Sequence, residues 1–164
     1  MLKRLAVLTS AAFAAAILAL AAPHFVATSR AAPADDGIVR VKSAYGMEET
    51  IARLKKDIEG KGIVFFLAVD QSKLGENAGI KLNPSTLLIF GNPPLGITFL
   101  TSNPNAGLDW PVRLLVNQDG SGQVWAVYTD FFWIARRHNI TDRDPQFKMA
   151  SEVIASITSS VAAK

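Results

Sequence analysis

The stretch Thr86-Leu87-Leu88-Ile89-Phe90-Gly91-Asn92-Pro93-Pro94 joins an unbroken apolar run to a Gly-Asn-Pro turn. Consecutive apolar residues that end in a turn signal predict a central strand covered on both of its faces. Asn92 can then cap a helix that begins at Pro93. Strand, turn and helix start meet here, and the free N–H groups of a helix start attract anions and polar ligands. The same residues also suit a simple change of chain direction, and we prefer this structural interpretation of Gly91 and Asn92.

Strand and helix patterns precede this stretch. Residues 39–45 alternate apolar and polar side chains, which predicts a strand with one exposed face. Apolar residues at helical spacing over 47–58 predict a helix. Residues 63–69 are apolar at every position, which predicts a strand buried on both faces or packed against a partner subunit. A short helical turn is expected over 72–79, with Leu74 facing inward.

The second half of the chain contains the clearest turn. Residues 112–116 and 123–128 flank Asp119-Gly120-Ser121-Gly122, which predicts a hairpin of two antiparallel strands. Helical segments are predicted over residues 95–100, over 131–138 with Asp130 as cap, and from 144 onward. The expected fold class is α+β, with one compact domain over 35–164 whose mainly antiparallel sheet is backed by helices.

The first 34 residues have the features of an export signal. Lys3 and Arg4 precede an apolar stretch over residues 5–22, and Ala32-Pro33-Ala34 supplies the small residues of a cleavage site. We therefore expect a signal peptide over 1–34 and a periplasmic or secreted domain. The alternative is an uncleaved membrane anchor, because the apolar stretch approaches the roughly 20 residues that span a bilayer.

Charge and cysteine content limit the chemistry of the mature domain. Removal of residues 1–34 takes away three of the 17 basic side chains and leaves 14 against 14 acidic ones. A formally neutral domain offers no electrostatic case for nucleic acid or for an anionic membrane surface. The chain has no cysteine, so disulfides and thiolate chemistry are excluded and packing must supply the stability.

Four motifs follow one another along the mature chain: Glu48-Glu49-Thr50-Ile51, residues 87–93, residues 108–116, and Tyr128-Thr129-Asp130 before an Ala-Arg-Arg-His helix. Together they resemble the domain of unknown function 302 family over nearly the whole mature chain. The resemblance implies a compact α+β fold in bacterial and archaeal proteins and a tendency to form dimers. It implies no settled activity and no catalytic residues, so the motif positions are only candidates.

His138 is the only histidine that remains after the expected cleavage. Zinc sites built from several His or Cys ligands of one chain are therefore excluded, and we predict no metal site. A Ser-His-Asp triad would need His138 as base and a nearby Asp, but no Gly-x-Ser-x-Gly elbow identifies the serine. A haem ligand at His138 lacks an attachment motif, and the cofactor stays unknown. We prefer a structural role for His138 near a helix C-terminus.

Five residues are the ligand-binding candidates: Asn92, Arg113, Tyr128, Asp130 and His138. Arg113 lies in an otherwise apolar strand, where a buried charge needs a carboxylate or a ligand anion, although a solvated face would need neither. Tyr128 and Asp130 lie at a strand end, where a crevice can form, but capping explains Asp130 as well.

These observations favour a non-catalytic module that binds a small molecule or a protein, and the apolar strands lead us to expect a homodimer. The alternative is a hydrolase or other enzyme that uses His138 as acid or base. The enzyme requires His138 to contact both a serine and a carboxylate in a pocket, whereas the binding module predicts neither contact.

Overall fold

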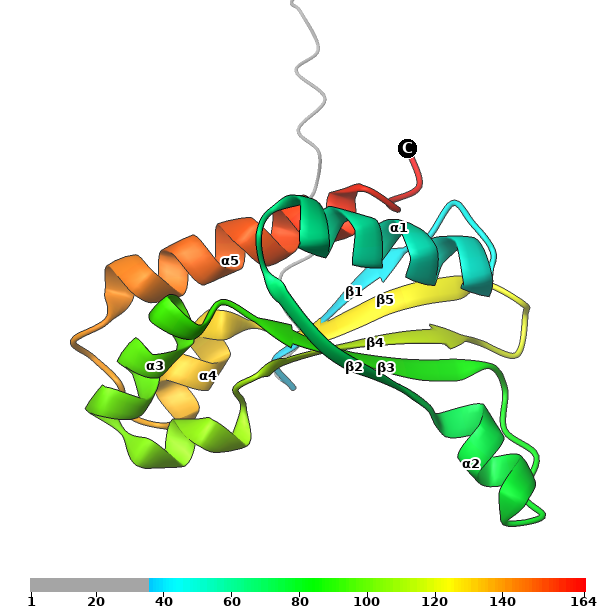
Figure 1. The fold of residues 1–164 in the computed structure, drawn as a ribbon, viewed down its shortest axis with the longest axis horizontal. Coiled ribbons are helices and arrows are strands. Elements are labelled where there is room, and N and C mark those ends of the chain that lie inside the picture. The colour runs from blue at the N-terminus through cyan, green and yellow to red at the C-terminus, as the bar shows by residue number, and fades with distance from the viewer. Residues whose placement is uncertain (1–35) are drawn as a thin grey trace, which may run out of the picture. The chain divides into compact units, whose positions relative to one another are not determined.

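Five antiparallel strands form the centre of the structure, a computed structural model that describes residues 36–164 (Figure 1). The predicted signal peptide over 1–34 lies outside these residues. The order across the sheet is β1-β5-β4-β3-β2. The strands are β1 (Ile38–Lys42), β2 (Val64–Asp70), β3 (Ser85–Gly91), β4 (Val112–Gln118) and β5 (Val124–Thr129).

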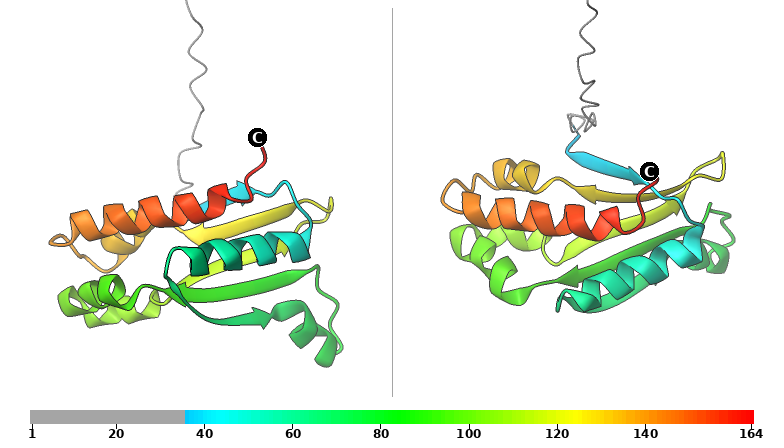
Figure 2. Two further views of the ribbon diagram at one scale, coloured as in Figure 1. Left: turned by 45° about the horizontal axis from the view of Figure 1, so that its top comes forward. Right: turned by 90° about the horizontal axis from the view of Figure 1, so that it is seen from above.

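Two long helices, α1 (Met47–Gly60) and α5 (Asp144–Ser159), pack on one face of the sheet (Figure 2). The shorter segments α3 (Pro93–Ser102), η1 (Pro104–Leu108) and α4 (Phe131–Arg137) gather at one end of the sheet. Helix α2 (Gln71–Asn77) lies at the opposite end, between β2 and β3. The predicted α+β class and the order of its elements are confirmed. In the described part of the chain, none of these helices combines the length and the apolar character needed to cross a bilayer.

The core lies between the sheet and the two long helices. Leu88 of β3 and Leu114 of β4 are fully buried, and they face the same layer as Leu54 of α1 and Ile157 of α5. Burial of each such side chain contributes about 1.5–3 kcal/mol. By contrast, Leu87 on the other face of β3 stays partly exposed. The prediction that this strand is covered on both faces is therefore wrong, because helices cover only one face.

The face of the sheet that α1 and α5 do not cover is called the open face below. Its side chains follow from the strand register, in which Val69 pairs with Leu87, Leu87 with Leu115, and Leu115 with Val127. Its apolar members are Ile38, Val64, Leu67, Val69, Leu87, Ile89, Leu115, Trp125 and Val127, and its basic members are Arg40, Lys42 and Arg113. The open face therefore has an apolar centre with basic side chains toward its margins.

Strand β2 forms an edge of the sheet and is not a buried strand. Val64, Phe66 and Leu67 are 45%, 43% and 46% exposed. The predicted burial of this strand on both faces is wrong, and the alternative of a partner subunit stays a prediction. Leu74 of α2 is also exposed and does not face inward, because α2 lies beyond the end of the sheet and no layer covers it there.

The β4–β5 hairpin turns where the sequence predicts, and one carboxylate organises it. Asp119 Oδ1 accepts hydrogen bonds from Ser121 Oγ at 2.6 Å, Ser121 N at 2.9 Å and Gln123 N at 3.1 Å. Its Oδ2 accepts from Trp125 Nε1 at 2.8 Å. These donors, the Ser121 hydroxyl foremost, lower the pKa of Asp119 to about 2.

This shift makes the stability of the hairpin depend on pH. The folded-state pKa lies below the ordinary value of 3.8, so ionised Asp119 favours the folded state above that pH. The contribution is lost as the pH falls toward about 2. We expect Asp119→Asn to lower Tm at neutral pH and the difference from the parent to shrink between these two values. Thermal unfolding across pH checks this, with Glu152→Gln on the exposed side of α5 as control. A Tm difference that is constant with pH would contradict it.

Candidate functional site

A buried carboxylate, Asp109, gathers three basic side chains at the end of the sheet that carries η1 and α4. Its side chain is 4% exposed. Oδ1 accepts from Arg113 Nη2 at 2.9 Å and from Arg137 Nη1 at 3.1 Å. Oδ2 accepts from Arg137 Nη1 at 3.0 Å and lies 2.6 Å from His138 Nε2. One carboxylate therefore links the residue after η1 to β4 and to the end of α4.

His138 is the C-cap residue of α4 and is itself buried. Because a carboxylate only accepts hydrogen bonds, its short contact with Asp109 places the imidazole hydrogen on Nε2. The backbone carbonyl of His138 also accepts from Asn103 Nδ2 at 2.8 Å. Its place at a helix C-terminus agrees with the structural role that the sequence favours. The partner Asp109 supplies a further reason for its burial.

The Asp109–His138 pair has the geometry of a carboxylate that orients an imidazole. In acyl-transfer enzymes such a pair activates a nucleophile within about 2.6–3.2 Å of the imidazole. Within residues 36–164, no serine hydroxyl makes a hydrogen bond to His138. The structure therefore differs from both expectations: the binding module predicts no carboxylate contact, and the enzyme requires a serine contact as well.

Asn92 and Asp130 both act as helix caps. Asn92 Oδ1 accepts from Leu95 N at 3.3 Å at the start of α3. Asp130 Oδ1 accepts from Trp133 N at 2.8 Å at the start of α4. Each side-chain oxygen therefore satisfies a helix N–H group that has no partner within its own helix.

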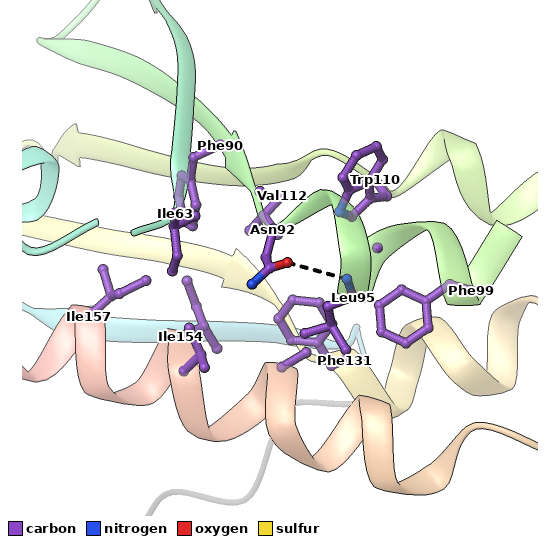
Figure 3. Close-up of a pocket in the computed structure, with 14 residues that line it drawn as sticks. Ile63, Phe90, Asn92, Leu95, Phe99, Trp110, Val112, Phe131, Ile154 and Ile157 are labelled. Carbon is purple, nitrogen blue, oxygen red and sulfur yellow. Dashed lines mark hydrogen bonds between the residues drawn. The ribbon is translucent and has the colours of Figure 1, made fainter. Parts of the chain in front are cut away.

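A small apolar cavity lies beneath Asn92, where β3 ends and α3 begins (Figure 3). Its volume is about 40 Å³, and its walls include Phe90, Phe99, Phe131 and Ile154. Pockets that bind small molecules typically enclose about 300–1,000 Å³. In this conformation the cavity has room for only a few water-sized groups, so a metabolite does not fit without displacement of the core.

Trp110 explains the two glycines at this junction. A Cβ atom on Gly96 would lie 1.9 Å from Trp110 Nε1, and one on Gly91 would lie 3.2 Å from the same ring. Phe66 meets the indole edge-on, with 6.4 Å between ring centroids. Gly96 therefore lets α3 rest on the indole, which gives a packing reason for a residue that otherwise weakens a helix.

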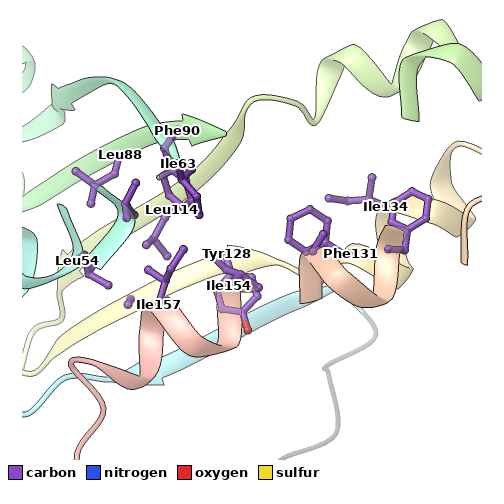
Figure 4. Packing of buried hydrophobic residues seen from close by; sticks show 14 of the residues in the cluster. Leu54, Ile63, Leu88, Phe90, Leu114, Tyr128, Phe131, Ile134, Ile154 and Ile157 are labelled. Carbon is purple, nitrogen blue, oxygen red and sulfur yellow. The ribbon is translucent and has the colours of Figure 1, made fainter. Parts of the chain in front are cut away.

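The five candidates do not form one site. Arg113 and His138 meet through Asp109, whereas Tyr128 belongs to the buried core (Figure 4). Asn92 and Asp130 serve different helices. Arg113 finds a carboxylate although its side chain is 48% exposed. In the described part of the chain, no group of three or more His, Cys, Asp or Glu side chains is placed to hold a metal ion.

Sequence reasoning missed Asp109 and Arg137 as members of the cluster. Asp109 precedes Trp110-Pro111 at a strand start, and Arg137 precedes His138 at a helix end. Both positions lie in motifs that carry the family resemblance. That resemblance is the one signal that marks them, because 28 residues separate the two and no local pattern links them.

Loss of the Asp109 charge should destabilise the domain. Asp109→Asn leaves two guanidinium groups close together and weakens every hydrogen bond of the cluster. We expect the free energy of unfolding to fall by roughly 2–4 kcal/mol, toward the lower value because water reaches both arginines. Chemical denaturation measures this. Asp142→Asn, at an exposed carboxylate, is the control with a much smaller expected effect. Equal changes in the two variants would contradict a special role for Asp109.

Comparison with known proteins places the chain in a family. The family described as "Domain of unknown function DUF302" matches residues 39–163. Two proteins named fluoride-specific ion channels, FluC 1 of Brucella suis biovar 1 (strain 1330) and FluC 2 of Brucella melitensis biotype 1 (strain ATCC 23456 / CCUG 17765 / NCTC 10094 / 16M), are 39% identical to this chain over 106 residues. The match covers 65% of this chain but 42% and 39% of theirs, so the chain spans about four tenths of the length of these curated relatives.

A solved structure has the same fold. The crystal structure of an uncharacterized conserved protein DUF302 from Bacillus stearothermophilus matches with a TM-score of 0.70. The match covers 76% of this chain and 98% of that chain at 19% sequence identity. At this identity the likeness concerns the fold alone. The match of the family over 39–163 includes β4, Asp109 and His138. The chain belongs to the DUF302 family.

Proposed function

We propose that the chain is a non-catalytic protein-binding module and that a second copy of the chain covers its open face. The observation that carries this proposal is the contrast between the two sides of β3 and β4. Leu88, Leu114 and Val116 are fully buried beneath the helices, whereas Leu87 and Leu115 on the open face are partly exposed. A row of apolar side chains across several strands is the kind of surface that proteins cover with a partner.

A second copy supplies a matching surface. Two sheets pack face to face about 10 Å apart when both inner faces are apolar, and a twofold pair brings the same patch from each copy. The basic side chains Arg40, Lys42 and Arg113 lie toward the margins of the open face. In such a pair these charges lie at a solvated rim, where water and salt screen their repulsion.

A non-catalytic role agrees with the positions of the buried titratable side chains. In residues 36–164, Asp109 and His138 form a buried ionisable pair, and their contact connects the end of α4 to the residue after η1. Acid–base or nucleophilic catalysis needs a further group at a substrate-sized opening. Asp109 lines a hollow of only about 20 Å³, and the walls of two larger hollows of about 380 Å³ in the described residues include neither Asp109 nor His138. The hydrolase alternative therefore has less support than the binding module.

The oligomeric state of the domain, and of a variant with a charge on its open face, tests this proposal. Light scattering on residues 35–164 should give the mass of a dimer at high micromolar concentration. Leu115→Lys places a charge at the apolar centre, so we expect it to give a monomer with little loss of fold. Met149→Lys is the control, because Met149 is 54% exposed on the helix side. A monomeric parent, or a Leu115→Lys variant that stays dimeric, would overturn the proposal.

We also propose that the domain acts in the periplasm or outside the cell. The basis is the basic start, the apolar stretch and the Ala-Pro-Ala end of residues 1–34. Mass spectrometry of the protein from its native source should find an N-terminus near Asp35. An intact Met1 in the soluble cytoplasmic fraction would refute export, and an intact Met1 in the membrane fraction would favour the anchor.

A further inference from the structure

The Asp109 cluster, which consists of Asp109, Arg113, Arg137 and His138, carries more positive than negative charge. Two guanidinium groups share one carboxylate, so one positive charge is left over even when His138 is neutral. Arg113 and Arg137 donate to the same atom, Asp109 Oδ1, at 2.9 and 3.1 Å. Their two nitrogens therefore lie no further apart than these distances combined, about 6 Å. Like charges at this separation repel, and a bound anion would relieve that repulsion.

Each arginine uses only part of its hydrogen-bonding capacity. A guanidinium has five N–H groups. Arg113 donates through Nη2 alone, to Asp109 and to the Leu108 carbonyl, and Arg137 donates through Nη1 alone. In residues 36–164, their other nitrogens have no protein acceptor. The side chains are 48% and 44% exposed, so these donors are open to solvent.

The guanidinium groups of Arg113 and Arg137 are also held in place in the absence of a ligand. The buried Asp109 fixes one nitrogen of each, and the Trp133 ring lies 5.6 Å from the guanidinium carbon of Arg137. Arg113 also lines a hollow of about 20 Å³ together with Asp109, Val112, Thr129, Phe131 and Ile134, which is room for about one water-sized group. Donors that are already ordered bind with a smaller loss of conformational entropy.

We propose that Arg113 and Arg137 form a binding site for the carboxylate group of a short-chain organic acid. The single surplus charge matches a monoanion, and the planar fork of arginine matches the two oxygens of a carboxylate. The hollow beside Arg113 has mixed polar and apolar walls and room for about one water-sized group, so it favours a small acid over one with a long chain. Arg113 lies at the margin of the open face, outside its apolar centre, so the site stays at the solvated rim if the proposed dimer forms.

A titration followed by NMR tests the site, with sodium acetate as probe and sodium chloride at matched ionic strength as reference. The Nε–H resonances of Arg113 and Arg137 should shift and saturate with acetate but not with chloride. Arg113→Lys and Arg137→Lys keep the charge beside Asp109 but lose the fork. We expect each to weaken acetate binding about tenfold, the factor for one lost charge-assisted hydrogen bond.

Arg136→Lys is the matched control, because Arg136 is exposed in the same turn of α4 and makes no side-chain hydrogen bond within the described residues. Unchanged acetate binding in this variant supports the site. The proposal is overturned if acetate gives no saturable shift in the parent, if chloride gives the same shift, or if the Arg136→Lys variant is affected as strongly as the other two. Tighter binding of inorganic phosphate than of acetate would overturn the assignment to carboxylates.

Discussion

The packing of α1 and α5 against a single face of the sheet is the constraint on which the other features depend. Leu54 and Ile58 of α1 and Ile154 and Ile157 of α5 bury one side of β3 and β4. No element of the described chain does the same for the other side, where Leu87 and Leu115 lie. The described domain thus has one layer of helices on one layer of sheet, and the open face is the surface at which we propose that a second copy packs.

The Asp109 cluster performs a different task at the end of the sheet. One buried carboxylate, Asp109, follows η1 and contacts Arg113 of β4 and Arg137 and His138 at the end of α4. These contacts hold the short segments η1 and α4 against the end of the sheet. On the buried side of this cluster, both Asp109 oxygens accept hydrogen bonds and His138 Nε2 contacts Oδ2, and these contacts connect distant segments of the fold. The exposed side of the cluster, at Arg113 and Arg137, retains free donors. Structural and binding roles can therefore coexist in the same few residues.

Local features of the fold could be predicted from the sequence because their causes are local. Asn92 and Asp130 cap helices whose N–H groups lie three residues ahead, and the Asp119 turn closes over four residues. The exposure of β2 and of one side of β3 could not be predicted. An apolar run has the same composition whether a helix, a partner or nothing lies above it, and only the packing of distant elements decides among these.

The candidate site shows the same limit. Arg113 and His138 attract attention in the sequence as a charge within an apolar strand and as a lone histidine. Their common partner Asp109 does not, because the contact with His138 spans 29 residues and depends on the length of the β4–β5 hairpin and the direction of α4. Tyr128 was a candidate because of its place at a strand end. Side chains alternate between the two faces along β5, and Tyr128 lies on the face that points toward the core.

The most direct measurement is hydroxyl-radical footprinting of the mature domain at low and at high protein concentration. If a second copy covers the open face, the reactivity of Leu87, Leu115 and Trp125 will fall as the concentration rises. Met149, exposed on the helix side, will keep its reactivity and serves as internal reference. Equal reactivity of the three open-face residues at both concentrations, relative to Met149, would contradict the account.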